Sequence, residues 1–199
     1  MFPRRTLFTG ALALGAACLL AACAEDKPAF RAVDITGADY AQGWELTDQN
    51  GQVRTLKDFA GKVVVVFFGF TQCPDVCPTA MQEMVEAKQL LGADGARLQS
   101  VFITVDPERD TPELLKAYMA NFGADFVALR PTPEQLPKVT KDFKIYFKKV
   151  EGKTPTSYTM DHSAGSFTFD PQGRVRLYNR YGSGAAALAA DAKILLSGK

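Results

Sequence analysis

Several features are scarce in this sequence. Basic charge has almost no surplus, because Lys and Arg exceed Asp and Glu by one and the formal net charge is +1. A chain without a basic stripe is a poor candidate for nucleic-acid binding. Disorder is excluded as the main theme, since 47% of the residues are hydrophobic and only 23% are charged. The length of 199 residues allows one domain with a solid core and not obviously two.

A long hydrophobic run is also missing. The longest candidate, Leu7 to Ala22, is 16 residues long, whereas a membrane-spanning helix needs about 20. It follows Arg4 and Arg5, so we expect residues 1–22 to be a signal peptide. The run ends at Cys23 in a pattern that resembles the bacterial lipoprotein processing site, which makes Cys23 the expected lipid anchor. An uncleaved short anchor is the alternative, and both place the domain across the inner membrane, tethered.

The remaining chain predicts an α/β fold with a mixed central sheet flanked by helices. Residues 23–43 are polar, with scattered Gly and Pro, and are expected to be a tether to a domain over 44–199. Continuous apolar runs predict buried strands, and apolar residues at helical spacing predict helices. The expected strands and hairpins are 44–48 with 53–56, 62–68, 98–105, 126–129, 146–150 with 157–160, and 166–169 with 175–178. The expected helices are 78–91, 111–122, 133–143 interrupted by Pro137, and 185–196.

Only two cysteines lie in the predicted domain, Cys73 and Cys77, in the segment that joins a buried strand to a helix. Ligand and redox sites favour such a loop at the carboxyl end of a strand. Side chains four residues apart on a helical turn share one face, with Cβ atoms about 5–6 Å apart. A helix N-terminus also favours thiolates. The pair is therefore a candidate disulfide or a candidate soft-metal site.

The single histidine, His162, follows a short predicted strand. Cu(I) accepts two thiolates and one imidazole in a trigonal site, whereas zinc usually needs a fourth ligand. Neither pattern is specific by itself. A lone CxxxC in a secreted protein is most often a structural or redox disulfide, a lone histidine is usually an ordinary surface or core residue, and spacing does not show that the imidazole reaches the sulfurs.

Four stretches in a fixed order carry a family resemblance: Gly61–Lys62, Phe68–Pro78, Val105–Pro112 and Asp161–Ser163. Together they resemble the Sco (or SenC) family of copper-binding assembly factors for cytochrome c oxidase. The resemblance covers the chain from about residue 44 to the end. It implies a thioredoxin-like fold with an inserted hairpin near the metal-binding histidine.

The resemblance also implies residue roles. Cys73, Cys77 and His162 would bind a copper ion, as Cu(I) or Cu(II), and the two cysteines would also form a redox disulfide. Asp106 would lie near the metal and tune its ligands; the equal alternative is that its stretch shapes a turn and caps the next helix.

The expected function is therefore a membrane-tethered copper chaperone, not an enzyme, on the periplasmic side of the bacterial inner membrane. Its expected partners are the membrane, through the lipid anchor, the oxidase subunit that carries the copper-A centre, and a periplasmic copper donor; no nucleic acid is expected. The main alternative is a thiol–disulfide oxidoreductase that reduces the copper-A cysteines. A peroxidase is a weaker third candidate, and a purely structural disulfide would leave the reduced protein without metal.

Overall fold

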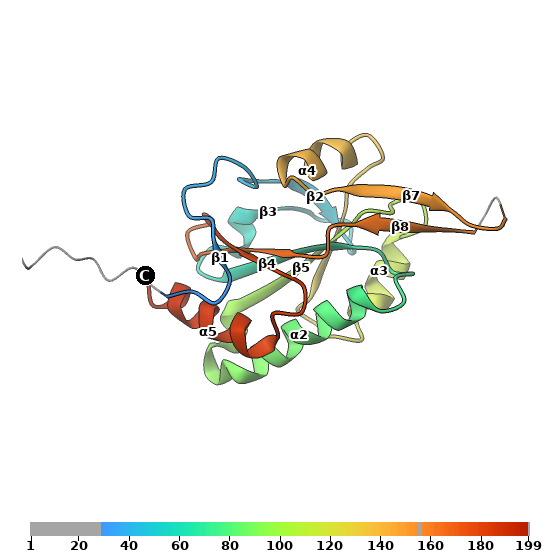
Figure 1. Cartoon of the computed structure of the whole chain (residues 1–199). Helices are drawn as coiled ribbons and strands as arrows, with labels where there is room; N and C mark the ends of the chain where they lie inside the picture. The colour runs from blue at the N-terminus through green and yellow to red at the C-terminus, as the bar shows by residue number, and fades with distance from the viewer. Residues whose placement is uncertain (1–28, 155–156, 199) are drawn as a thin grey trace, which may run out of the picture.

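The computed structural model describes residues 29–154 and 157–198 (Figure 1). Within these ranges the strands are β1 (Val33–Asp34), β2 (Glu45–Asp48), β3 (Val53–Thr55), β4 (Val63–Gly69), β5 (Leu98–Thr104), β6 (Val127–Arg130), β7 (Phe147–Glu151), β8 (Tyr158–His162), β9 (Ser166–Phe169) and β10 (Val175–Asn179). The α-helices are α2 (Val76–Leu90), α3 (Pro112–Met119), α4 (Leu136–Asp142) and α5 (Ala185–Leu196). Two short 3₁₀ helices are η1 (Leu56–Phe59) and η2 (Gly92–Arg97).

Eight of these strands form one mixed sheet in the order β1-β10-β9-β4-β5-β6-β2-β3. The central strand β4 pairs in parallel with β5 and antiparallel with β9. Every residue of β4 and β5 is buried, as a continuous apolar run requires when both faces of a sheet are covered. Helices α2 and α5 pack together on one face, and α4 lies on the other (Figure 1). The predicted α/β class with a mixed, helix-flanked sheet is confirmed.

Aromatic side chains on β4 pack on both faces of the sheet and fix the strand in place. The Phe68 ring centroid lies 5.0 Å from that of Phe143, just after α4. The Phe67 centroid lies 6.3 Å from that of Phe102 on β5. Full burial of one such side chain contributes roughly 1.5–3 kcal/mol. The loop that follows Gly69 therefore starts from a rigid strand end.

The inserted hairpin is also confirmed. Strands β7 and β8 form a separate two-stranded sheet in which Phe147 pairs with His162. The hairpin extends beyond the main sheet, at the end of the molecule opposite the ends of the described chain (Figure 1). His162 is therefore the last residue of a strand rather than part of a loop.

Two helix starts differ from the sequence prediction. Helix α2 begins at Val76, two residues before the expected start at Pro78, so Cys77 lies in its first turn. Helix α4 begins at Leu136, so Pro137 lies in its first turn instead of interrupting a longer helix. Proline fits a first turn because the N–H that it lacks would be unpaired there.

The described part of the predicted tether, residues 29–43, packs against the domain. Strand β1 pairs with β10 at the sheet edge, and Ala41 is 1% exposed. The N–H groups of Arg31 and Ala32 each donate to the buried Asp191 carboxylate at 2.8 Å. The folded part thus begins upstream of residue 44. The signal peptide, Cys23 and residues 24–28 lie outside the described residues.

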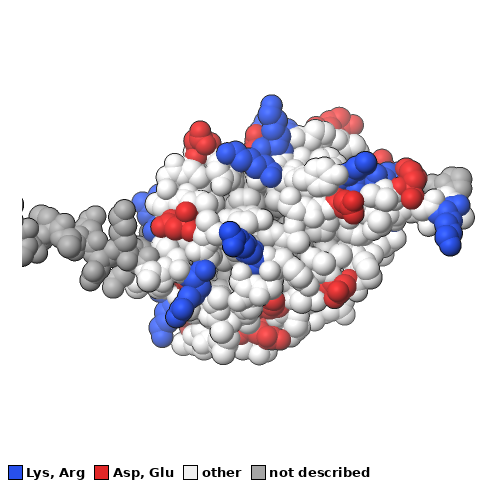
Figure 2. Space-filling view, viewed as in Figure 1, with Lys and Arg blue, Asp and Glu red and all other residues white. Residues whose placement is uncertain are grey.

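Two surface properties bear on the localisation and partner predictions. None of the helices in the described ranges has the length and apolar character needed to cross a bilayer. On the face shown in Figure 2, basic and acidic side chains are interspersed, so this face carries no basic stripe.

Candidate metal centre

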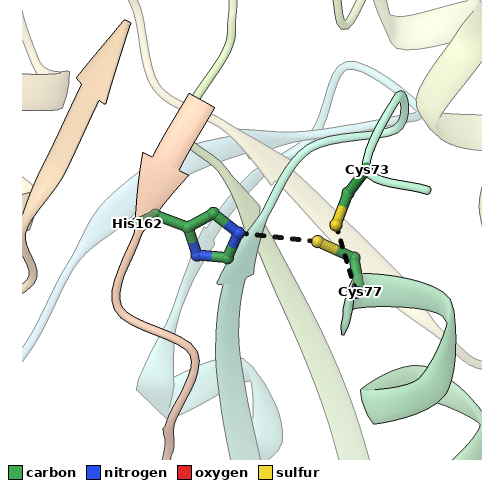
Figure 3. Close-up of side chains that lie close together, drawn as sticks. All are labelled: Cys73, Cys77 and His162. Atoms are coloured by element: carbon green, nitrogen blue, oxygen red, sulfur yellow. Dashed lines mark hydrogen bonds between the residues drawn. The ribbon is translucent and has the colours of Figure 1, made fainter. Parts of the chain in front are cut away.

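The structure brings the three predicted ligand residues together from three different elements. Cys73 lies in the loop after β4, Cys77 in the first turn of α2, and His162 at the end of β8. One ligand atom from each residue lies within 4.8 Å of the other two (Figure 3). Metal bonds of about 2.0–2.3 Å to sulfur and nitrogen need ligand atoms roughly 4 Å apart in a trigonal site. The site therefore needs only a small contraction to hold one ion.

The His162 imidazole has the orientation and charge state of a metal ligand. Its Nδ1 lies 2.9 Å from the Ser163 carbonyl oxygen; because a carbonyl only accepts, Nδ1 carries the proton. Nε2 then has a free lone pair, and it faces Cys77 Sγ at 3.6 Å. Burial lowers the pKa of His162 below its usual value of 6.5, so the ring is neutral at neutral pH.

Two aromatic rings hold the imidazole in place. The ring centroids of Phe67 and Phe70 lie 6.1 Å and 5.9 Å from that of His162, with interplanar angles of 82° and 88°. Such edge-to-face contacts favour one ring orientation. They come from β4 and from the loop that carries Cys73, so the segment that leads to one thiol also orients the imidazole.

The two thiols have unequal surroundings. Cys77 is 0% exposed, and burial, followed by its hydrogen bond with Cys73, raises the pKa of its thiol. Desolvation of a charged sulfur at this position opposes the thiolate that a helix N-terminus favours. Cys73 is partly exposed, and its Sγ accepts a hydrogen bond from the Cys77 backbone N–H at 3.3 Å.

Gly69 makes room for the buried sulfur. A Cβ atom at this position would lie 2.9 Å from Cys77 Sγ and 2.8 Å from the Phe102 ring. Real Cβ atoms essentially never approach that closely. The last residue of β4 must therefore be glycine for Cys77 to occupy its place.

Comparison with known proteins identifies the family. The SCO1/SenC family model matches residues 33–197, most of the chain. This chain belongs to the SCO1/SenC family. The match begins at β1, so the family unit includes residues 33–43 of the segment that was predicted to be a tether.

Individual SCO1/SenC relatives support the assignment. A SCO2-like protein of Rickettsia felis is 36% identical over 159 residues, which are 78% of this chain and 78% of that protein. The copper-bound structure of Bradyrhizobium japonicum ScoI is 39% identical, with a TM-score of 0.70, over 77% of this chain and 97% of that one. A SCO1/SenC family lipoprotein from Bacillus anthracis is 26% identical, with a TM-score of 0.69, over 84% and 99% of the two chains. The predicted thioredoxin-like fold is confirmed by these structures.

One residue of this SCO1/SenC site that the sequence analysis missed is Asp110, which is fully buried. Its carboxylate accepts hydrogen bonds from the Thr71 N–H at 3.1 Å, the Thr71 hydroxyl at 2.6 Å and the Thr104 hydroxyl at 2.5 Å. Burial raises the pKa of Asp110. These bonds tie the cysteine loop to the end of β5.

Asp106 belongs to a second network. Its carboxylate accepts from the Tyr158 hydroxyl at 2.8 Å and pairs with the Arg109 guanidinium, so it contacts the hairpin rather than a thiol or the imidazole. Its backbone carbonyl accepts the N–H of Arg109 and of Asp110, and Thr111 caps α3. Arg109 and Asp110 lie in the family-like stretch Val105–Pro112, but their partners Tyr158 and Thr71 lie far away in the chain, so the sequence alone does not relate them.

Proposed function

We propose that this protein is a copper chaperone that binds Cu(I) or Cu(II) through Cys73, Cys77 and His162. It would pass the ion to the subunit of cytochrome c oxidase that carries the copper-A centre. The observation that carries the proposal is the convergence of two thiols and one neutral imidazole within 4.8 Å. Copper bound to a relative of 39% identity supports copper as the ion, and so does the donor set, because soft thiolates select Cu(I) and imidazole suits copper generally.

The unequal burial of the ligands suggests an order of transfer. Cys73 and His162 are partly exposed, whereas Cys77 is buried. Ligands of an accepting protein would replace Cys73 or His162 first and Cys77 last. The protein would bind and release copper without chemical turnover, so it would not be an enzyme. Oxidation to a Cys73–Cys77 disulfide would remove both soft ligands and stop binding.

We place the protein on the periplasmic side of the inner membrane, tethered through lipid on Cys23 and loaded there by a copper donor. The sequence around Cys23 supports the lipid anchor, as does the Bacillus anthracis relative, which is itself a lipoprotein. Metabolic labelling with a fatty-acid analogue tests it. Label that disappears in Cys23→Ala is expected, and an unlabelled wild-type protein would refute the lipid anchor.

Copper reconstitution tests the chaperone proposal. The reduced protein should bind one Cu(I) or one Cu(II) per chain, and Cys73→Ser, Cys77→Ser and His162→Ala should each weaken binding. Thr159→Ala is the matched control, because its exposed side chain lies on β8 and alternates away from the face of His162. Loaded wild-type protein should then transfer copper to a purified copper-A domain. Failure of the wild-type protein to bind copper would refute the proposal.

A thiol–disulfide oxidoreductase is the second candidate, and one observation favours it. Cys73 is partly exposed, so a partner's disulfide can reach its Sγ, and this Sγ lies beside Cys77, whose N–H it accepts. Cys73 would attack an oxidised copper-A disulfide, and Cys77 would then displace the product as a dithiol, leaving Cys73–Cys77 oxidised until an external dithiol reduces it. This reaction does not need the imidazole. Oxidase activity in cells that survives His162→Ala but not Cys73→Ala would favour the reductase.

A further inference from the structure

The hairpin that carries His162 has little backbone support. Strands β7 and β8 pair only with each other among the described strands, and an isolated two-stranded hairpin is at best marginally stable in water. Both cysteines, in contrast, follow the central strand of the main sheet. His162 lies four residues before Ser166, which joins the main sheet, so the distance between the imidazole and the sulfurs depends on this short connection and on side chains that attach the hairpin to the domain.

Arg109 makes such an attachment. Its side chain, 17% exposed, extends from the loop between β5 and α3. One guanidinium nitrogen, Nη1, donates both to the Tyr158 carbonyl oxygen of β8 at 2.8 Å and to Gln72 Oε1 at 3.1 Å. Gln72 is the neighbour of Cys73, and Tyr158 is four residues before His162 on the same face of the strand. A single side chain thus bridges the cysteine loop and the hairpin.

The bridge is held from both ends. Arg109 Nε pairs with the Asp106 carboxylate, which is 3% exposed. The other Asp106 oxygen accepts the Tyr158 hydroxyl at 2.8 Å. The Arg109 guanidinium carbon also lies 3.5 Å from the centre of the Tyr158 ring, a cation–π distance. Asp106, Arg109 and Tyr158 therefore form a closed set of contacts, and moving the hairpin away would break the three that involve Tyr158.

We infer that Arg109 is a positioning residue that holds His162 against the thiol pair and thereby sets how well the site binds Cu(II) relative to Cu(I). The inference rests on the proposed copper-binding function. The two thiolates come from the loop after β4 and the helix turn that follows it, and they are sufficient for soft Cu(I), whereas Cu(II) favours nitrogen ligands. Loosening the hairpin should therefore cost Cu(II) much more than Cu(I).

The test measures Cu(I) and Cu(II) dissociation constants for the reduced protein by competition with calibrated chelators. Arg109→Gln should weaken Cu(II) binding about 10–100-fold, which is the usual cost of removing a residue that keeps a metal ligand in position. Cu(I) binding should change by less than about threefold. The Cu(II) electron paramagnetic resonance spectrum should lose nitrogen hyperfine structure, as it should in His162→Ala. Arg109→Lys should change the ratio of the Cu(II) to the Cu(I) dissociation constant in the same direction and less strongly, because an ammonium keeps the charge but lacks the planar fork of a guanidinium.

Arg174→Gln is the matched control. Arg174 pairs with buried Asp170 in the turn between β9 and β10, at the end of β4 opposite the cysteines. If Arg109→Gln and Arg174→Gln change the two affinities alike, or if Arg109→Gln keeps the wild-type ratio, the inference is wrong. If Arg109→Gln fails to fold, the ratio in Arg109→Lys decides in the same way. A wild-type protein that binds no copper would instead refute the proposed function. If His162→Ala has the same ratio of Cu(II) to Cu(I) dissociation constants as the wild-type protein, the role of the imidazole is refuted.

Discussion

At the scale of single residues, solvent reaches the three candidate ligands unequally. Cys77 is 0% exposed, while Cys73 and His162 retain some contact with solvent. A buried thiol has a raised pKa because the low-dielectric surroundings disfavour its thiolate. Copper binding must therefore include the free-energy cost of deprotonating Cys77, and this cost makes the copper affinity of the site depend on pH.

The first prediction concerns that dependence. With the pKa of Cys77 raised, the free protein keeps this thiol protonated at neutral pH, and each bound copper releases its proton. The Cu(I) association constant should rise at least tenfold per pH unit between about pH 6.5 and 8.5. His162 adds nothing over this range, because its lowered pKa leaves the ring neutral. Chelator competition at four pH values measures the slope, which should fall by about one in Cys77→Ser; a slope near zero in the wild-type protein would contradict the prediction.

A second prediction tests the space around the same sulfur. In Gly69→Ala the added methyl group would meet Cys77 Sγ at 2.9 Å and ring atoms at 2.8 and 2.9 Å. We expect a loss of about 1–3 kcal/mol in the free energy of unfolding, as for other overpacked cores, together with weaker copper binding. Urea unfolding and Cu(I) titration measure the two effects. Gly43→Ala is the control, since nothing lies within 4 Å of its added Cβ; equal behaviour of the two variants would show that Gly69 is not needed for space.

At the scale of secondary-structure elements, side-chain and backbone bonds at the turns decide which strands stay paired. Asp170, 1% exposed, follows the last residue of β9 and organises the turn to β10. Its carboxylate accepts the N–H groups of Gln172 and Arg174, both at 3.0 Å, and pairs with the side chains of Arg174 and Arg176. Burial alone would raise the pKa of Asp170, but these bonds together lower it. The turn is therefore stabilised by an ionised carboxylate.

The third prediction follows from the sign of that shift. A carboxylate with a lowered folded-state pKa contributes stability above the unfolded value of about 3.8, and this contribution is lost as the pH falls through the folded value. Asp170→Asn should lower the free energy of unfolding by about 2 kcal/mol at pH 7, and the deficit should shrink below pH 4. Urea unfolding at pH 7 and pH 3.5 measures it. Asp39→Asn, at an exposed position, should be within about 0.5 kcal/mol of the wild-type protein; a deficit that stays constant with pH would argue against an ionised Asp170.

Elements with strong local patterns were predictable from the sequence. The apolar run of β4 and the turn residues between β9 and β10 each predict their strands, because burial on both faces and tight turns leave clear residue preferences. The start of α2 was not predictable to the residue, since Asp75 makes no side-chain cap. β1 was missed because two exposed residues leave no periodic pattern.

At the scale of the whole molecule, the site depends on long-range closure. Cys77 and His162 are 85 positions apart, and no local pattern relates them; the family resemblance, rather than spacing, predicted that they meet. The same limit applies to Arg109 and Tyr158, 49 positions apart, and to Thr71 and Asp110, 39 positions apart. Residue types with metal-binding chemistry can be read from the sequence, but the side chains that hold them in place require the fold.

The N-terminal segment shows the same dependence on distant partners. Asp191 on α5 is 1% exposed, and its two carboxylate oxygens accept the N–H groups of Arg31 and Ala32, 160 and 159 positions away. β1 then adds two residues to the sheet edge beside β10, and Ala41 is buried in the core. Removing this segment would expose apolar surface and leave a carboxylate in a site built to receive two donors.

The fourth prediction compares two shortened chains, one that begins at residue 29 and one that begins at residue 44. The shorter chain should be less stable by about 3 kcal/mol or more, since hydrogen bonds to a charged group contribute roughly 1.5–3 kcal/mol each. For a domain of this size the thermal midpoint should fall by roughly 6–12 °C. Asp191→Asn in the longer chain measures the contribution of the carboxylate and should give part of the loss in the free energy of unfolding. The same substitution in the shorter chain should cost less, because the two N–H donors to Asp191 are already gone. Equal thermal midpoints for the two chains would show that residues 29–43 act only as a tether, with the domain beginning at residue 44.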